Sequence, residues 1–564
     1  MITFSNNPQI AEKQMQAIIF YLTTFGYIDG DFDESERTFV IEYIEKLVAH
    51  RVNSAIPEGQ ETLRAELTEK YTAHFHEEFE RIDQYIQDMF AETTASDEDQ
   101  QTFVQTRLKL RCLEIFKSFD EPGQEELMDI VDDLLMADGV AHPSEVKFRA
   151  ELAELLEEDL GIELIDQGDA EAGRLTVSML PPPPIDETDH PFFEQFEYHY
   201  SNEQQMLLQQ LEADRALIER TMALFRAQQA AGNGQLSGIT SVDQLKGKDP
   251  FLDGHVYVVP TGRGKSFDVT VLGDIHGCYS CLKAAVAQSR FIEKLEAYRK
   301  NPQTHPEPKL VLLGDYIDRG LFSLNGVLRA VMQLVNMAPN HVYMLRGNHE
   351  MYFEFKGEVY GGVKPAEAIN SLKPHVPTAS LRHYIDFFES MPNMLFLGET
   401  LFVHGGIPKD LTLKEKYRDM SSLNDKQIRF EMMWGDPSAA DVVPARLQQQ
   451  SIRFPFGKMQ AAAFLQRVGC HTIVRGHEKI LDGFDHTYNE GVVQLFTLFS
   501  CGGVKNADLP PKSGFRDITP MAISMKITDN DVELLPWEIN YEPYNHSDRN
   551  AFFKEAPRIE HVTY

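Results

Sequence analysis

Three short stretches in the second half of the chain decide its fold: Gly273-Asp-Ile-His-Gly277, Gly314-Asp-Tyr-Ile-Asp-Arg-Gly320 and Arg346-Gly-Asn-His-Glu350. Each stretch follows an apolar run of strand length, at residues 267–272, 309–313 and 341–345. Each also places glycine beside an acidic, amide or imidazole side chain, and glycine lets a backbone turn sharply and approach a neighbour closely. The pattern predicts strands whose carboxyl ends carry functional groups.

Two later strand-like runs end in the same way. Residues 401–403 lead into His404-Gly-Gly406, and residues 472–474 lead into Arg475-Gly-His477. Short apolar strands alternate with helices throughout this half, which is an α/β pattern. Because functional groups in α/β sheets gather beyond the carboxyl ends of strands, we expect the five ends to converge on one site.

The side chains at these ends are suited to binding metal ions. Carboxylate, amide and imidazole donors suit manganese, iron or zinc, and the absence of cysteine among them argues against a structural zinc cluster. These side chains are enough to provide ligands for two divalent ions. We expect manganese first, with iron or zinc as alternatives. We expect the first ion on Asp274 and His276, the second on Asn348, His404 and His477, and Asp315 between them.

The stretches above, in this order and at these intervals, resemble the signature motifs of the phosphoprotein phosphatase family. His404-Gly-Gly406, Trp434-Gly-Asp-Pro437 and Arg475-Gly-His477 extend the resemblance, which covers about half of the chain. It implies a calcineurin-like metallophosphoesterase β-sandwich flanked by helices. It also implies a phosphomonoester hydrolase, above all a serine/threonine protein phosphatase, in which a bridging water or hydroxide attacks phosphorus.

The resemblance assigns roles to individual residues. His349 would donate a proton to the leaving oxygen, Asp318 would hold its other ring nitrogen, and Arg319 would grip the phosphoryl oxygens. A second gripping arginine is expected, but the spacing leaves Arg453 and Arg446 open, with Arg453 preferred. The Asn-Tyr pair expected after residues 494–500 is replaced by Cys-Gly-Gly-Val, so the substrate-side wall there is not predicted.

Two other functions are compatible with parts of this pattern. Symmetrical diadenosine tetraphosphatases share the Gly-Asp-x-His-Gly start, but they typically carry Ala-Arg-Gly where this chain has Asp318-Arg-Gly320, which favours the protein phosphatase. A non-catalytic interaction protein with a vestigial site is disfavoured, because all six expected ligands and His349 are present.

The first part of the chain has a different character. At 564 residues the chain exceeds the size of one hydrophobic core. We expect residues 1–175 to form an acidic, all-helical domain that weakly resembles tellurite-resistance TerB-like modules through its corners at Asp29-Gly30 and Asp138-Gly139. Alternating Asp29, Asp31 and Asp33 suggest a calcium loop, but the glycine and glutamate that such a loop needs are missing, so helix capping is the preferred interpretation and looser metal binding is an alternative.

The charge of the chain is concentrated in this region. The whole chain carries a net charge of -34, and residues 1–200 account for about -31 of it. Such a surface repels nucleic acid and anionic lipid, so we predict neither as a partner. Basic proteins or cations would fit it, in a regulatory or interaction role, although acidity that merely keeps the region in solution is the simpler interpretation.

We expect a proline-rich linker and a connecting helix at residues 176–250, the catalytic domain at residues 251–535, and a tail at residues 536–564. The connecting helix, at about 202–231, should bury an apolar stripe of Met206, Leu207, Leu211, Leu217 and Met222.

The sequence also indicates where the protein works. It contains no apolar run long enough for a membrane helix, no visible secretory signal and only five cysteines, so we predict a cytoplasmic location. Cys278 and Cys281 could form a redox pair, but ordinary helix packing is the preferred interpretation.

Overall fold

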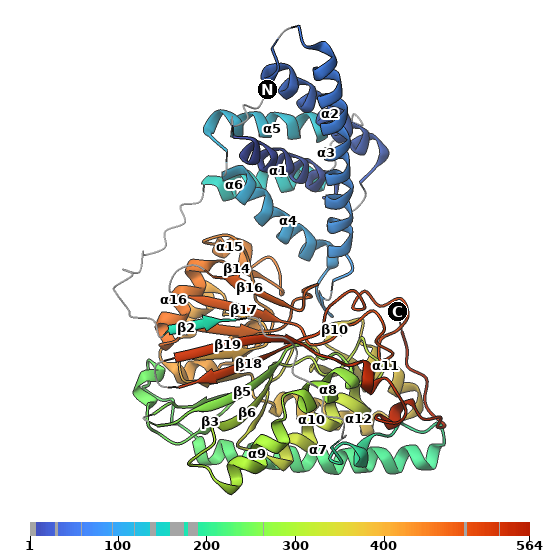
Figure 1. Cartoon of the computed structure of the whole chain (residues 1–564), viewed down its shortest axis with the longest axis vertical. Helices are drawn as coiled ribbons and strands as arrows, with labels where there is room; N and C mark the ends of the chain where they lie inside the picture. Colours follow the sequence, from blue (N-terminus) through green and yellow to red (C-terminus); the bar gives the residue numbers. More distant parts are fainter. Residues whose placement is uncertain are drawn as a thin grey trace. The chain divides into compact units, whose positions relative to one another are not determined.

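The computed structural model describes residues 7–28, 32–57, 59–92, 94–117, 119–135, 143–157, 174–178, 190–262, 264–489, 493–528 and 531–563. The chain groups into two compact units (Figure 1). The helical unit comprises Met1–Thr94, Glu98–Glu163 and Arg446–Ile452. The other unit comprises Ala95–Asp97, Leu164–Ala445 and Arg453–Tyr564, and because it contains the predicted catalytic residues it is called the catalytic unit. The predicted corners at Asp29-Gly30 and Asp138-Gly139 and the prolines at 181–184 lie outside the described residues.

The described part of the helical unit before residue 158 consists mainly of α-helices: α1 (Pro8–Gly26), α2 (Glu34–Ala55), α3 (Glu61–Met89), α4 (Gln100–Lys117), α5 (Glu121–Leu135) and α6 (Pro143–Glu157). Their apolar faces meet in a core in which the rings of Phe25 and Phe148 pack edge to face, 5.2 Å between centroids. Helix α2 begins at a capping box, in which Asp33 accepts a hydrogen bond from the Glu36 amide and Glu36 accepts one from the Asp33 amide. The predicted capping role of Asp33 is thus seen in the structure.

Two β-sheets packed face to face form the catalytic unit. The six-stranded sheet has the order β2 (Arg174–Val177), β19 (Asp531–Glu538), β18 (Met521–Ile527), β5 (Phe267–Leu272), β6 (Glu307–Leu312) and β7 (Val342–Met344). The seven-stranded sheet has the order β16 (Phe484–Tyr488), β17 (Gln494–Leu498), β15 (Thr472–Arg475), β12 (Thr400–Val403), β11 (Met394–Leu397), β4 (Val256–Val259) and β3 (Phe251–Asp253). The predicted sandwich is confirmed.

The alternation of side chains along β5 and β6 explains the layers. Val269 and Val271 of β5 and Val311 of β6 belong to the core between the sheets, whereas Leu272 and Leu312 belong to the core beneath the helices. Val271 and Val311 are direct partners in the parallel register of these strands. Because successive side chains of a strand point to opposite faces, a strand that is apolar on both faces is buried on both.

Helices cover the outer faces of the sandwich (Figure 1). The outer face of the six-stranded sheet carries α7 (Gln204–Gly232), α8 (Tyr279–Gln288), α9 (Phe291–Lys300), α10 (Arg329–Met337) and α12 (Ala379–Ser390). The seven-stranded sheet is covered by α14 (Lys426–Met432) and α16 (Lys458–Val468). The C-terminal residues take part as well, since Tyr544 and Phe552 are buried and Phe552 packs on Tyr279 at the start of α8.

The prediction that Met206 belongs to the buried stripe of α7 was wrong. Leu207, Leu211 and Leu217 are buried, but Met206 is 47% exposed. Adjacent residues of a helix lie about 100° apart around its axis, so Met206 cannot share the face that Leu207 sets.

The surroundings of Cys278 and Cys281 agree with ordinary helix packing, the preferred interpretation of this pair. Cys278 directly precedes α8 and Cys281 lies within it, and both are free and buried. The Cys278 sulfur lies 3.0 Å from that of Cys501, inside the core beneath the helices.

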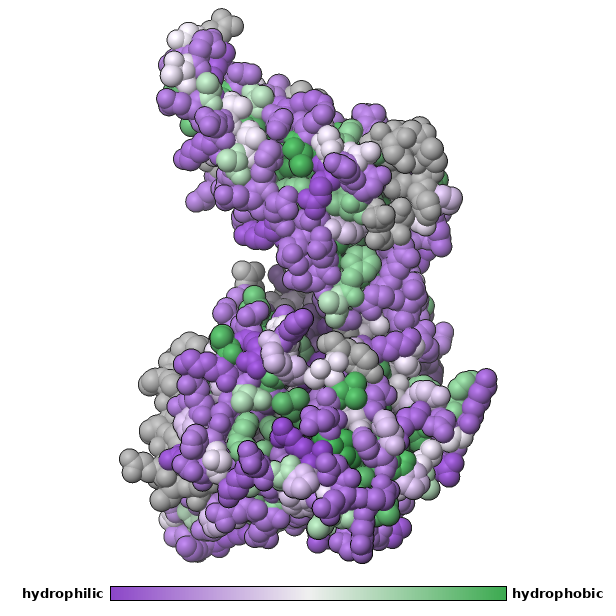
Figure 2. All heavy atoms as spheres, turned by 90° about the vertical axis from the view of Figure 1, so that its right-hand side faces the viewer, coloured by the Kyte–Doolittle hydropathy of each residue, from purple (hydrophilic) through white to green (hydrophobic). Residues whose placement is uncertain are grey.

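Within the described ranges, no helix combines the length and the apolar character that crossing a bilayer requires. On the face drawn in Figure 2, hydrophilic side chains predominate and apolar ones are scattered among them.

Candidate metal centre

The five predicted strand ends meet between the two sheets rather than along one of them. Strands β5, β6 and β7 belong to the six-stranded sheet, and β12 and β15 belong to the seven-stranded sheet. Backbone contacts join the ends directly: the Ile275 and His276 amides donate to the Asp315 carbonyl, and the Gly476 amide donates to the His404 carbonyl. The sandwich therefore brings together loops that are up to about 200 residues apart in the chain.

His276 defines the first group of ligand atoms. Its Nε2 lies 3.5 Å from Asp315 Oδ2 and 3.7 Å from Asp274 Oδ2. Its Nδ1 lies 2.9 Å from the Ile317 carbonyl, which accepts a hydrogen bond from Nδ1–H. This hydrogen bond fixes the ring and leaves the Nε2 lone pair for a metal ion.

His404, His477 and Asn348 form the second group. Asn348 Oδ1 lies 2.8 Å from His404 Nε2 and 3.0 Å from His477 Nδ1. His404 Nδ1 lies 3.1 Å from the Leu313 carbonyl, so this imidazole too is oriented by a backbone acceptor. Asp315 Oδ1 lies 3.4 Å from His404 Nε2, which means that Asp315 turns one oxygen toward each group.

The electrostatics favour a bound cation. Burial raises the pKa of Asp274 to about 7 and raises that of Asp315 well above its ordinary value, and the negative charges of Asp274 and Glu350 add to the rise at Asp315. Burial also lowers the pKa of His276, His349 and His404 well below the ordinary value, which favours neutral imidazoles at the expected ligands His276 and His404. Neutral imidazoles beside crowded, buried carboxylates are a donor set that fits divalent ions.

The backbone at these residues is unusual. Among the described residues other than glycine, seven have positive φ, and five of them are His276, Asp315, Asp318, Arg319 and His477. Strain of this kind persists where the surroundings hold a functional side chain in place. Glycine is required beside them, because a Cβ on Gly347 would lie 2.1 Å from Asp315 Oδ1 and one on Gly476 would lie 2.2 Å from Asp274 Oδ1.

His349 and Asp318 form a buried pair next to these groups. His349 Nδ1 lies 2.7 Å from Asp318 Oδ2, and His349 Nε2 lies 3.9 Å from Asp315 Oδ2. Burial raises the pKa of Asp318 to about 6, while the charge of Arg319 opposes the rise. His349 lies near enough to His276 and Asp315 for geometry alone to allow it as a ligand. Its hydrogen bond to Asp318 is the contact that the proton-donor role needs.

The two candidates for the second gripping arginine have different ion-pair partners. Arg453 donates to Asp436 at 2.7 Å, and its charge, like that of Arg319, lowers the pKa of His349. Arg446, on α15 (Ala445–Gln448), forms an ion pair with Glu154 of α6. The positive charges of Arg319 and Arg453 thus both add to the effect of burial in lowering the pKa of His349.

Sequence reasoning missed three acidic residues around the site. Glu350 accepts hydrogen bonds from the amides of Asp315, Tyr316 and Gly347, and so ties two of the loops together. Asp436 accepts from both Arg453 and Arg475, and Glu367 accepts from Arg319. Glu350 and Asp436 stand inside motifs that were recognised, whereas Glu367 lies in none.

Comparison with known proteins now identifies the region. Residues 267–480 match the calcineurin-like phosphoesterase family. This part of the chain is a calcineurin-like metallophosphoesterase domain of the phosphoprotein phosphatase type. The match confirms the resemblance predicted from the motifs and the hydrolase class of the domain. It spans all six expected ligands together with His349, Asp318, Arg319 and Arg453.

Its relatives are phosphatases at low identity. The chain is 26% identical over 238 residues to a serine/threonine-protein phosphatase of Caenorhabditis elegans, covering 41% of this chain and 47% of that protein. It is 25% identical over 244 residues to the catalytic subunit of serine/threonine-protein phosphatase 4 of Saccharomyces cerevisiae, covering 42% of this chain and 72% of that one. The chain thus spans about half the length of the first relative.

Among solved structures, a Saccharomyces cerevisiae serine/threonine phosphatase with similarity to human phosphatase PP5 aligns at 19% identity and a TM-score of 0.36. The alignment covers 58% of this chain and 90% of that one.

Proposed function

We propose that this protein is a metal-dependent phosphomonoester hydrolase with a dinuclear centre, and that it acts as a serine/threonine protein phosphatase. The observation that carries the proposal is the His349–Asp318 pair, joined at 2.7 Å beside a ligand set in which Asp315 faces both groups. A proton donor next to a two-cation site is what hydrolysis of a phosphate monoester requires.

The ligands would be shared between two ions. Asp274 and His276 would hold one ion, Asn348, His404 and His477 would hold the other, and Asp315 would contact both. Two divalent cations, when bound, lower the pKa of water and neutralise charge on a phosphoryl group. Manganese is the first expectation, with iron or zinc as alternatives, because mixed oxygen and nitrogen donors accept all three.

The protein's own residues would do the rest. Asp318 accepts a hydrogen bond from Nδ1–H of His349, which fixes the ring and leaves Nε2 on the side of the ligand groups. In its imidazolium form, whose charge the Asp318 carboxylate would stabilise, His349 would supply the Nε2 proton to the leaving alkoxide of phosphoserine or phosphothreonine. Arg319 and Arg453 would bind the phosphoryl oxygens, for which the planar guanidinium is suited.

Asp318 also favours a phosphoprotein over a dinucleotide substrate. The sequence comparison with diadenosine tetraphosphatases depends on this residue, and here its carboxylate is committed to His349 on one side and to the Ala368 amide on the other. The serine/threonine phosphatase names of the two relatives support the same choice.

We propose in addition that residues 251–535 are the catalytic domain and that residues 1–175 regulate or target it through a basic protein partner. The acidity of that region supports a basic partner and disfavours nucleic acid and anionic membranes. We also propose a cytoplasmic location, which the five free, buried cysteines support.

Chelation tests the proposal. We expect hydrolysis of an aryl phosphate to vanish when the protein is exhaustively chelated and to return with manganese. A panel of phosphopeptides measured beside diadenosine tetraphosphate should show higher kcat/KM on the phosphopeptides. Activity that survives chelation would exclude the dinuclear site, and preferential cleavage of diadenosine tetraphosphate would replace the protein phosphatase by the nucleotide hydrolase.

A further inference from the structure

Arg319 is held by a carboxylate that belongs to no recognised motif. Its Nη1 donates to both carboxylate oxygens of Glu367, each at 2.9 Å, and to the Pro365 carbonyl at 3.1 Å. The Arg319 side chain is 12% exposed and that of Glu367 is 8% exposed. At this burial the pair is shielded from water, so its geometry is far better defined than that of a surface ion pair.

Glu367 is the first residue of α11 (Glu367–Leu372), and the next residue contacts the site as well. The Ala368 amide donates to Asp318 Oδ1 at 2.8 Å, while Asp318 Oδ2 faces His349. Two consecutive residues of α11 therefore hold Asp318 and Arg319, two consecutive residues of the loop at 314–320. Both of these loop residues have positive φ, so their orientation depends on such external contacts.

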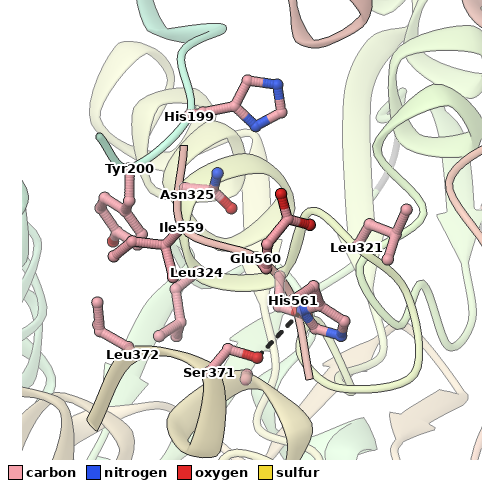
Figure 3. A pocket seen from close by; sticks show the side chains of 12 residues that line it. His199, Tyr200, Leu321, Leu324, Asn325, Ser371, Leu372, Ile559, Glu560 and His561 are labelled. Carbon is pink, nitrogen blue, oxygen red and sulfur yellow. Dashed lines mark hydrogen bonds between the residues drawn. The ribbon is translucent and has the colours of Figure 1, made fainter. Parts of the chain in front are cut away.

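Helix α11 is itself fixed from its other side. Figure 3 shows Ser371 and Leu372 of α11 facing Ile559 and His561 across a pocket that His199 and Asn325 also line. Ser371 Oγ accepts from the Val562 amide at 2.7 Å and lies 3.4 Å from His561 Nδ1. Ile369 and Leu372 are buried in the core beneath the helices. Glu367 thus belongs to a helix that is held in place by hydrogen bonds and by buried apolar contacts.

The segment that leads to Glu367 starts at the site. Three residues after His349 the chain enters a hairpin of β8 (Tyr352–Phe355) and β9 (Glu358–Gly361), and it returns to Arg319 through Pro365 and Glu367. His349 and Glu367, the partner of Arg319, therefore stand at the two ends of one short segment, which leaves the site and returns to it.

We propose that Glu367 is a positioning residue, which holds the guanidinium of Arg319 in the orientation in which it binds a phosphoryl group. The inference rests on the proposed function, in which Arg319 grips the substrate. Arg319 contacts Glu367 through Nη1, and a guanidinium is a rigid fork, so fixing one nitrogen fixes the directions of the others. Without Glu367 the side chain would sample several rotamers, and small displacements of a binding group are costly.

Binding of orthophosphate to the manganese-loaded full chain, measured by calorimetry, tests this inference without relying on turnover. We expect Glu367→Ala to raise the dissociation constant for orthophosphate about 10-fold. Glu367→Asp and Glu367→Gln, which keep an acceptor for Nη1, should lie between Glu367→Ala and the wild type. The matched control is Glu354→Ala on β8, which removes the acceptor of the exposed Glu354–Arg382 pair and should leave binding unchanged.

Two further readouts separate positioning from a merely structural role. In an Arg319→Ala background, Glu367→Ala should weaken orthophosphate binding no further, because its effect passes through Arg319. In the hydrolysis assay KM should rise about 10-fold with little change in kcat, equally for a phosphopeptide and an aryl phosphate. A defect that came through Ala368 and His349 would instead fall mainly on the phosphopeptide, whose leaving group needs the proton.

Several outcomes would overturn the inference. Unchanged or tighter orthophosphate binding by Glu367→Ala would mean that the carboxylate does not orient Arg319 or that it competes with phosphate. Additive losses in the double variant would show that Glu367 acts independently of Arg319. Failure of the proposed function looks different, since wild-type protein would then bind orthophosphate with the expected variant pattern but hydrolyse no phosphomonoester.

Discussion

The helical unit and the catalytic unit use acidic residues in opposite ways. In the helical unit carboxylates lie mostly at the surface, and no described non-glycine residue there has positive φ. In the catalytic unit Asp274, Asp315, Asp318 and Glu350 are almost completely buried, and all seven described non-glycine residues with positive φ belong to this unit. Exposed carboxylates leave a helix free to follow ordinary packing rules, whereas buried ones next to a strained backbone indicate a ligand.

The comparison predicts that a buried carboxylate of the catalytic unit will be the most sensitive residue of the chain. Asp315→Asn removes the charge that both ligand groups share, so we expect turnover to fall by more than the roughly 100-fold that loss of a supporting partner costs. Metal content measured by mass spectrometry should fall for both ions. Full occupancy with near-normal turnover in this variant would remove Asp315 from its place between the groups.

A smaller and more selective loss is expected at His349. His349→Asn removes proton donation, which is worth on the order of 10² to 10⁴ in rate. The loss should fall on phosphopeptides, whose alkoxide leaves poorly, and much less on a nitrophenyl phosphate, whose leaving group needs no proton. Comparing kcat for the two substrates, together with metal content, checks this.

Asp318→Asn provides the matched variant for His349. It disturbs the orientation of the imidazole without deleting it, so it should show the same substrate bias in milder form. Loss of metal in His349→Asn would place this residue among the ligands, as its distance from His276 and Asp315 allows. An equal slowing of both substrates would point to phosphate binding instead.

Much of the site could be predicted from sequence because the residues that perform the chemistry stand in short, dense motifs. The strand at residues 267–272 coincides with β5, and Asp315 faces both ligand groups as its place in the motif suggests. What sequence could not show is what holds these residues. Glu367 lies 48 residues from Arg319, and no local pattern distinguishes it from an ordinary helix-starting glutamate.

The remaining misses have the same origin in long-range geometry. Spacing alone left Arg446 and Arg453 open, because the segment between Pro437 and Phe454 does not align with a motif, and it could not show that Arg446 pairs with Glu154 and Arg453 with Asp436. The strand ends were expected to converge on one site, but the motifs did not show that the sandwich divides them between its two sheets. Sequence periodicity describes one face of one element and does not say which other element covers it.

The smallest expected effect lies in the helical unit and tests whether its carboxylates are only structural. Asp33 caps α2, with its side chain accepting from the Glu36 amide at 2.8 Å. Asp33→Ala should cost about 1 kcal/mol of local stability, whereas Asp33→Asn, which keeps the acceptor, should cost only a few tenths. Amide hydrogen exchange at the first turn of α2 in the full chain reports this directly.

If Asp33 only caps the helix, calcium should leave the exchange rates of the wild type and of both variants unchanged. A calcium-dependent slowing in the wild type that Asp33→Ala abolishes would show that this residue binds a cation, since a ligand that binds the folded state alone stabilises it. The helical unit would then share with the catalytic unit the use of carboxylates as metal ligands.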